Sequence, residues 1–262
     1  GTPRGYFSSL KIDTDRVLHI PIKNIEELKF DLVKQLEGMD VEDKVFVMID
    51  SIGNLASKKE LDDAKDEKSV ADMTRAKQLK SLFRMVTPYL TLRDVPLIAV
   101  NHTYETQEMF SKQVVSGGTG VYYSADNIWI IGRRQQKKGT EIEGYDFIIN
   151  VEKSRFVKEK SKLPISVTWE GGIRKYSGLL EVALEGGFVI KPSMGWYQKL
   201  DMETGEELEG KYRAAETETS EFWQDILNHP KFSKFVQDKY ALGEGLLTGI
   251  ELADKLEMEA DE

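Results

Sequence analysis

The stretch Val95–Ala125, VPLIAVNHTYETQEMFSKQVVSGGTGVYYSA, changes from apolar to polar at Asn101. Its apolar run Pro96–Val100 predicts a buried strand of a parallel sheet, because such strands are covered on both faces. Ligands of these sheets gather beyond the carboxyl ends of the strands, where Asn101 and His102 would lie. The polar segment that follows, with its Gly117–Gly120 turn, is long for a connection and is expected to be functional. The alternative is a surface loop without a task.

The bulk composition limits the class of protein. The chain has 262 residues, enough for one large domain with an appendage or for two small domains. It has no apolar run near the roughly twenty residues of a membrane helix and no leader of the signal-peptide kind. We therefore expect a cytoplasmic protein without a membrane partner. Zero cysteines exclude a disulfide framework, and three scattered histidines argue against a zinc or haem site.

The net charge of −9 is distributed unevenly along the chain. Asp201–Glu209 carries −5 and Glu244–Glu262 carries −6, so the remainder carries +2. Basic residues cluster in Arg133–Lys138 and again in Lys153–Lys162. The overall acidity therefore does not exclude a nucleic-acid partner, which binds mainly through local cations. A solvated surface is the alternative interpretation of these basic runs.

Helix and strand patterns alternate before the opening strand. A capping box at Asn24 predicts a helix that runs to Gly38, and the apolar segment Lys44–Ser51 resembles a second buried parallel strand. A second helix is expected over Asp72–Thr87, ended by Pro88 and the Arg93–Pro96 turn. Helix, strand, helix and strand in this order are typical of an α/β fold with a mostly parallel central sheet flanked by helices.

The pattern changes after the polar segment, where strand-like runs follow one another as in an antiparallel extension. We expect a core over residues 1–200 and a small helical C-terminal subdomain with an acidic tail over residues 201–262. Strands are expected over Asn127–Gly132, Tyr145–Val151, Pro164–Trp169, Phe188–Ile190 and Gly195–Leu200, and helices over Ser177–Leu184, Phe222–Leu227, Lys231–Leu242 and Leu246–Leu256.

Asp50 is a candidate for nucleotide chemistry. Nucleotide hydrolases use an apolar strand that ends in aspartate, the Walker B pattern, to hold the water shell of Mg²⁺ beside a triphosphate. An aspartate that caps a following helix would give the same pattern. Asn101 and His102 would end the neighbouring strand, where they could hydrogen-bond a γ-phosphate or the attacking water. The competing interpretation of His102 is a buried core histidine.

Five segments carry a resemblance to a known family. They are VFVMIDSIGNLASKKE, VADMTRAKQLKSLFRMVTPY, NHTYETQEMFSKQVVSGGTG, NVEKSRFVKEKSK and GGIRKYSGLLEVALEGGFV. In this order they resemble the RecA family of recombinases, most closely its members from T-even-like phages, over nearly the whole chain and less distinctly after Asp201. The resemblance implies a RecA-like P-loop NTPase core with ATP and Mg²⁺ as cofactors. It also implies single- and double-stranded DNA, further copies of the chain, a recombination mediator and a single-strand-binding protein as partners.

The resemblance also assigns roles at the nucleotide. Asp50 corresponds to the Walker B aspartate, which holds Mg²⁺ through water, and Ser51 lies beside it. Asn101 and His102 occupy the place of a polar pair that ends in glutamine in the bacterial family and senses the γ-phosphate. His102 departs from that glutamine and is similar to what phage members carry.

Lys153 and Arg155 match two cations that, in the family, reach the ATP of the neighbouring subunit. Charge that develops on a γ-phosphate needs fixed cations, and supplying them from a neighbour makes hydrolysis depend on assembly. Arg155 keeps the charge of the usual lysine and adds a bidentate fork.

Two segments resemble the DNA-binding loops of the family. Leu61–Asp72, with the basic helix face that follows it, resembles the first loop, and Thr103–Thr119 matches the second. The implied DNA contacts are Lys77, Lys80, Arg84, Met109, Phe110, Lys112, Gly117, Gly118 and Thr119. Glycines let the backbone approach a phosphate closely, and the cations add salt-dependent affinity.

The sequence contains no G-x-x-x-x-G-K-[ST] phosphate loop. In the family, that loop and the glutamate that activates water lie upstream of the position matching Gly1. We therefore expect a truncated stretch that alone neither binds ATP tightly nor hydrolyses it. Two alternatives remain, a RecA-like DNA-binding or scaffold module without ATPase activity and a RecA-fold replicative helicase domain. The Lys153–Arg155 segment and the Gly117-Gly118 pair match the recombinases better.

Overall fold

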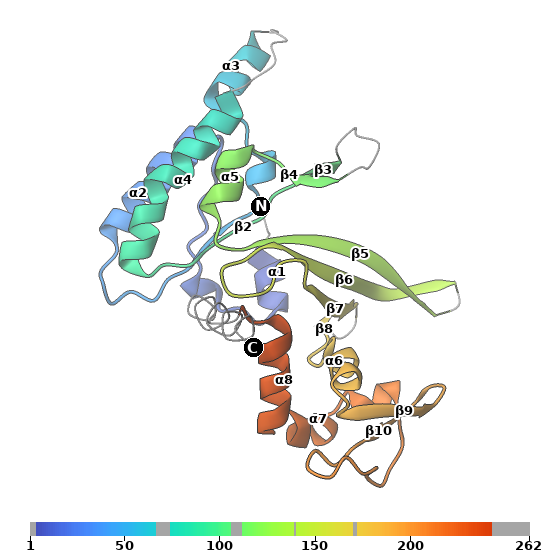
Figure 1. Ribbon diagram of the computed structural model, residues 1–262. Helices are drawn as coiled ribbons and strands as arrows, with labels where there is room; N and C mark the ends of the chain where they lie inside the picture. The colour runs from blue at the N-terminus through green and yellow to red at the C-terminus, as the bar shows by residue number, and fades with distance from the viewer. Residues whose placement is uncertain (1–3, 67–73, 106–111, 139, 170–171, 243–262) are drawn as a thin grey trace, which may run out of the picture. The chain divides into compact units, whose positions relative to one another are not determined.

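The computed structural model describes residues 4–66, 74–105, 112–138, 140–169 and 172–242 (Figure 1). The chain divides into two compact units, Gly1–Ala125 and Asp126–Glu262. Each unit has its own cluster of buried apolar side chains. Across the described ranges, no helix has the length and apolar character needed to cross a membrane.

The first unit alternates helices and strands, as its sequence predicts. The helical elements are α1 (Arg4–Ser9), η1 (Thr14–Arg16), α2 (Ile25–Gly38), η2 (Ile52–Asn54), α3 (Lys58–Lys65), α4 (Thr74–Arg93) and α5 (Thr119–Ser124). The strands are β1 (Val47–Ile49), β2 (Leu97–Ala99), β3 (Thr103–Glu105) and β4 (Gln113–Val115). β1 and β2 pair in parallel, with Val47 opposite Leu97, whereas β3 and β4 form an antiparallel hairpin.

The predicted capping box of α2 is confirmed in a modified form. Asn24 Oδ1 accepts a hydrogen bond from the Glu27 backbone N–H at 2.8 Å. The Glu27 carboxylate accepts from the backbone N–H of Lys23 at 2.8 Å, one residue before the cap. The first bond satisfies an N–H group that the first helical turn leaves without a partner, and the second ties the residue before the cap to the helix.

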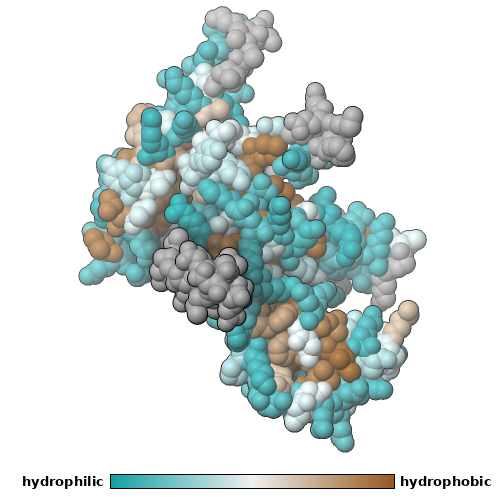
Figure 2. All heavy atoms as spheres, in the orientation of Figure 1, coloured by the Kyte–Doolittle hydropathy of each residue, from teal (hydrophilic) through white to brown (hydrophobic). Residues whose placement is uncertain are grey.

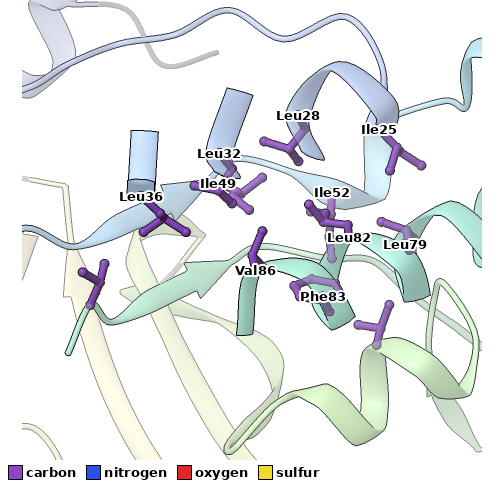
Figure 3. Close-up of a cluster of buried hydrophobic side chains, with 12 residues drawn as sticks. Ile25, Leu28, Leu32, Leu36, Ile49, Ile52, Leu79, Leu82, Phe83 and Val86 are labelled. Carbon is purple, nitrogen blue, oxygen red and sulfur yellow. The ribbon is translucent and has the colours of Figure 1, made fainter. Parts of the chain in front are cut away.

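The core of this unit lies between α2, α4 and one face of the β1–β2 pair (Figure 3). Apolar side chains at helical spacing on α2 and α4 point toward one another and toward the strands, so each helix buries one stripe. The labelled members of the cluster are Ile25, Leu28, Leu32, Leu36, Ile49, Ile52, Leu79, Leu82, Phe83 and Val86.

The prediction that β1 and β2 are buried on both faces is wrong. Ile49 is 8% exposed, but Met48 and Ile98 are 56% and 51% exposed. The helices of the unit cover only one face of the pair, and the side chains of successive strand residues point to opposite faces. The ladder is also shorter than the predicted Lys44–Ser51. Within the described residues, β1 and β2 are the only strands that pair in parallel.

The prediction that the second helix stops at Pro88 is wrong, because α4 continues through Pro88 to Arg93, the first residue of the predicted Arg93–Pro96 turn. Proline lacks the N–H that would bond to the carbonyl four residues earlier, so a helix through it loses one bond. Contacts to α2 hold the last turn in place. Tyr89 donates a hydrogen bond to the Glu37 carboxylate at 2.7 Å, and the Arg93 guanidinium donates to the Met39 carbonyl.

The second unit begins with an antiparallel meander, which confirms the predicted change of pattern. The sheet has the order β5 (Ile128–Lys138), β6 (Glu141–Lys153), β7 (Lys162–Thr168) and β8 (Gly172–Ile173). Next come α6 (Leu179–Glu185) and the strands β9 (Val189–Ser193), β10 (Trp196–Lys199) and β11 (Tyr212–Arg213). The chain then forms η3 (Ala214–Thr217), α7 (Ser220–Leu227) and α8 (Pro230–Tyr240). The predicted helix Leu246–Leu256 lies outside the described residues.

A second core joins α6, β9, α7 and α8. Phe188 meets Phe232 edge to face with ring centroids 5.1 Å apart, and Tyr176 stacks on Trp223 at 6.2 Å. Trp223 is 1% exposed. Residues on both sides of the predicted division at Leu200 contribute to this one cluster.

Candidate nucleotide and DNA site

The ends of β1 and β2 bring the predicted nucleotide-facing residues to one edge of the first unit. The Val100 N–H donates to the Ile49 carbonyl at 3.0 Å, and the Ile52 N–H donates to the Val100 carbonyl at 2.9 Å. These bonds continue the parallel pairing past the two strands. The side chains that follow on each strand therefore emerge side by side.

Asp50 and Ser51 differ in their surroundings. The Asp50 carboxylate is exposed at the end of β1. Ser51 Oγ is buried and has no hydrogen-bond partner within the described part of the chain. A buried hydroxyl normally has a partner, so Ser51 Oγ has hydrogen-bonding capacity left for a polar ligand atom. An exposed carboxylate next to such a hydroxyl fits a hydrated Mg²⁺ ion and its nucleotide.

Asn101 and His102 are tied to the base of the hairpin. Asn101 Nδ2 donates to the Ser116 carbonyl at 2.7 Å, and the Ser116 N–H donates to the His102 carbonyl at 2.9 Å. His102 Nε2 lies 2.9 Å from Asn54 Oδ1, within hydrogen-bond distance. His102 is exposed, so its alternative interpretation as a buried core histidine is wrong.

Gly53 explains how the imidazole reaches Asn54. A Cβ atom added at Gly53 would lie 2.2 Å from His102 Cδ2. Carbon atoms do not approach so closely, so only glycine lets the ring lie against η2. The close contact fixes the ring beside the turn that follows Asp50.

Arg75, near the start of α4, joins this edge to the rest of the unit. Its Nε donates to the Leu55 carbonyl at 2.9 Å, and one terminal nitrogen donates to the carbonyls of Ile52 at 2.8 Å and Gly53 at 3.2 Å. The other terminal nitrogen lies 3.4 Å from Ser116 Oγ. Arg75 could not be predicted from the sequence, because its partners are mostly backbone carbonyls and no residue pattern reveals them.

The described ends of the predicted second DNA-binding loop form a hairpin. Thr103 pairs with Val115 and Glu105 with Gln113, so the two ends of the segment form a short antiparallel ladder. Lys112 is exposed at the start of the returning strand. Met109 and Phe110, two further predicted DNA contacts, lie outside the described residues.

The glycines after the hairpin have a packing role that the sequence does not show. Gly117 and Gly118 have φ of 98° and 79°, values that L side chains rarely adopt. A Cβ at Gly117 would lie 2.9 Å from Leu79 Cδ1, and one at Gly120 would lie 2.8 Å from Lys80 Cβ. These glycines turn the chain into α5 and let α5 lie on α4. Thr119, the first residue of α5, is exposed.

The three predicted cations of α4 are exposed and share a groove with α2. Lys77, Lys80 and Arg84 line a hollow of about 360 Å³ together with Lys29, Gln78 and Ser81. Lys29 Nζ lies 3.3 Å from Gln78 Oε1, so its charge is held over the groove. The visible surface around α3 and the start of α4 is mostly hydrophilic (Figure 2). Lys29 is the second residue that the sequence analysis missed, since it lies on a helix far away in sequence.

Lys153 and Arg155 belong to the second unit. Lys153 is the last residue of β6 and is half-buried. Arg155 Nε lies 3.0 Å from Asp126 Oδ1, and both side chains are mostly exposed. This exposed ion pair contributes little to stability, so Arg155 can readily exchange Asp126 for another anion.

Among the described residues, no three histidine, aspartate or glutamate side chains gather as a metal site. The predicted magnesium site remains a prediction.

Comparison with known proteins first identifies the class. The RecA protein of Tropheryma whipplei is 26% identical over 170 residues, which cover 64% of this chain and 38% of that protein. The RecA protein of Enterococcus faecalis is 24% identical over 240 residues, which cover 86% of this chain and 65% of that protein. Together with the strand ends and the hairpin, these matches identify a RecA-like α/β protein.

The family follows from a much stronger match. The recombination and repair protein of Enterobacteria phage T4 is 52% identical over 266 residues, covering 100% of this chain and 67% of that protein. The model for the C-terminal domain of the bacteriophage T4 recombination and repair protein matches residues 176–236. The chain therefore belongs to the UvsX family, that of the T4 recombination and repair protein. It spans about two thirds of the T4 relative's length and 38% and 65% of the two RecA proteins.

Proposed function

We propose that the chain is the core part of an ATP-dependent DNA recombinase that coats single-stranded DNA as a filament and promotes strand exchange. Such an activity would serve recombination, repair and recombination-dependent replication. Membership of the UvsX family supports the reaction class. The observation that carries the proposal is the bonded path from Asn54 through His102 to Ser116. It joins the nucleotide-facing strand ends to the hairpin that would face DNA.

The nucleotide side would bind ATP with Mg²⁺. Asp50 would hold the ion through water, and the Ser51 hydroxyl would meet a phosphate or the water shell. Bound Mg²⁺ neutralises charge on the transferred phosphate. Asn101 and His102 would hydrogen-bond the γ-phosphate. Any shift of their backbone would displace Ser116, to which both residues are bonded. An order–disorder change of the hairpin with nucleotide state is the switch that this connection allows.

Lys153 and Arg155 would act on the ATP of a neighbouring copy. The exposed Arg155–Asp126 pair would open on assembly and present the guanidinium to a phosphate. Hydrolysis would then require the filament. The chain would consist of a core, residues 1–200, and a C-terminal subdomain with an acidic tail, residues 201–262, and both would take part in that assembly. A mediator and a single-strand-binding protein are the further expected partners, in the cytoplasm of the phage's host.

The DNA side would combine Lys77, Lys80 and Arg84 with the hairpin. The hairpin contacts would be Met109, Phe110, Lys112, Gly117, Gly118 and Thr119. The three cations lie on one exposed face of α4, so they can follow the phosphates of one strand. The slope of log K against log salt is negative, and each phosphate of single-stranded DNA that the protein neutralises makes this slope steeper by roughly 0.7.

The test is the salt dependence of oligothymidylate binding, measured by fluorescence anisotropy. The variant Lys77→Ala/Lys80→Ala/Arg84→Ala should flatten the slope by about 2, since each cation accounts for roughly 0.7. The control Arg16→Ala/Lys34→Ala/Lys44→Ala removes three exposed cations of the same unit and should leave the slope unchanged. Equal slopes in all three proteins would refute the DNA site. Binding without DNA-stimulated hydrolysis, in a protein that joins this chain to a phosphate loop, would instead favour the scaffold alternative.

A further inference from the structure

Arg75 bonds to two segments to which the proposed function gives separate tasks, and it lies just after a third along the chain. It follows the segment Leu61–Asp72 that resembles the first DNA-binding loop. Its guanidinium bonds to the carbonyls of η2, the turn directly after Asp50 and Ser51. It also reaches Ser116, where the hairpin closes. We call these three contacts, together with the bond from Arg75 Nε to the Leu55 carbonyl, the Arg75 clasp.

We propose that Arg75 is the positioning residue that couples DNA contact to the nucleotide-facing edge. This inference rests on the proposed function and deepens it, because it names the group through which the two sites affect one another. Arg75 touches neither the phosphates nor the DNA bases in this role. It sets where η2, and with it Asp50 and Ser51, lies relative to the hairpin.

The clasp requires the geometry of arginine. The planar guanidinium presents five N–H groups in a fixed fork, and the four contacts use all three of its nitrogens. A lysine ammonium keeps the charge but cannot reach carbonyls spread over Ile52–Leu55 and a hydroxyl on another segment at once. Arg75 is half-buried, so its bonds are only partly exposed to competing water.

Ser116 is the point where the clasp meets the hairpin. Its N–H donates to His102, its carbonyl accepts from Asn101 and its hydroxyl faces Arg75. A displacement of Ser116 therefore acts on the β2 end directly and on η2 through Arg75. The contact to Arg75, at 3.4 Å, is the longest of the four in the clasp. We expect this bond to break first when the hairpin moves.

If Arg75 had a purely structural role, it would stabilise the first unit, but DNA binding at the hairpin would have no effect on η2. The two roles separate in amide hydrogen exchange, which reports local opening segment by segment. The chain is measured with and without an oligothymidylate. In the unaltered chain, bound DNA should slow exchange about tenfold both in the hairpin strands and in Ile52–Leu55.

Arg75→Lys should keep DNA affinity within about threefold, because the charge remains, and should keep the slowing in the hairpin. The slowing in Ile52–Leu55 should disappear. Ser116→Ala removes only the hydroxyl contact and should reduce the slowing in Ile52–Leu55 to a smaller degree. Ser116→Ala still tests the inference if the Arg75→Lys variant fails to fold. Arg93→Lys is the matched control, since Arg93 donates to a backbone carbonyl at the other end of the same helix.

The outcomes are distinct. Undiminished slowing in Ile52–Leu55 in both Arg75→Lys and Ser116→Ala would overturn the inference while leaving the proposed function intact. The same holds if the unaltered chain binds DNA without any slowing there. Failure of the unaltered chain to bind oligothymidylate would instead remove the proposed function. Loss of slowing in Arg93→Lys as well would show a general loss of rigidity and would also overturn the inference.

Discussion

At the scale of single residues, the contact between Gly53 and His102 is the tightest constraint on the candidate site. Gly53→Ala would place a carbon 2.2 Å from the imidazole, so the ring must leave Asn54 or η2 must shift. We expect a loss of about 1–3 kcal/mol in the free energy of unfolding, as for other overpacked sites. Urea unfolding of the variant gives this value.

Gly38→Ala is the matched control. Nothing lies within 4 Å of a Cβ added at Gly38, the last residue of α2. That change should be neutral or stabilise by up to about 1 kcal/mol, because alanine loses less conformational freedom than glycine. Equal effects of the two substitutions would contradict the close contact at His102.

Asp146 on β6 gives a prediction for pH. Burial acts to raise the pKa of its carboxyl, but hydrogen bonds from Gln136, Ser166 and Arg134, with the charge of Arg134, lower the pKa overall. A lowered pKa contributes stability above the ordinary aspartate pKa of about 4 and loses it as the pH falls through the lowered value. Asp146→Asn should therefore cost about 1–2 kcal/mol at neutral pH and less in acid. A difference from the unaltered chain that does not change with pH would disprove this.

Sequence alone could place some residues of the site and not others. Asp50, Asn101 and His102 each follow an apolar run, so strand ends could be predicted from them. Arg75 and Lys29 bond to carbonyls and side chains of segments far away in sequence, and such partners exist only after the chain has folded. The sequence contains no signal for either contact.

At the scale of elements, α4 shows how tertiary contacts override a local stop signal. The exposed Pro88 lies inside the helix, where it removes one backbone bond. Pro88→Ala should restore that bond and raise the free energy of unfolding by roughly 1–3 kcal/mol, given proline's low helix propensity. Chemical denaturation followed by far-UV circular dichroism measures the change. A destabilised variant would show that proline stabilises this turn in a way that the structure does not explain.

The strands and the polar segment were harder to predict than the helices. Helices α2 and α4 each show a stripe of apolar residues, and one buried stripe is enough to define a helix. The strands β1 and β2 are apolar on both faces although only one face is covered, so composition predicted more burial than exists. The strands β3 (Thr103–Glu105) and β4 (Gln113–Val115) have three residues each, too few for a clear alternating pattern, and only their pairing reveals them as strands.

At the scale of the whole molecule, the two units have separate cores, and their unfolding can be followed by different spectroscopic signals. Buried clusters join Ile25–Val121 in one unit and Tyr176–Phe232 in the other. All four tryptophans, at positions 129, 169, 196 and 223, belong to Asp126–Glu262. Tryptophan fluorescence therefore follows the unfolding of the second unit, whereas far-UV circular dichroism follows both.

This separation predicts a reciprocal pattern for matched core substitutions. Leu82 is 0% exposed in the first core and Ile226 is 1% exposed in the second. Truncation of either to alanine should cost about 2–5 kcal/mol, because the cavity cannot fully collapse. Leu82→Ala should lower the urea midpoint of circular dichroism while leaving that of fluorescence in place, and Ile226→Ala should lower the fluorescence midpoint. Equal fluorescence shifts in both variants would mean that the units unfold as one, since a shared transition carries any local loss to every reporter.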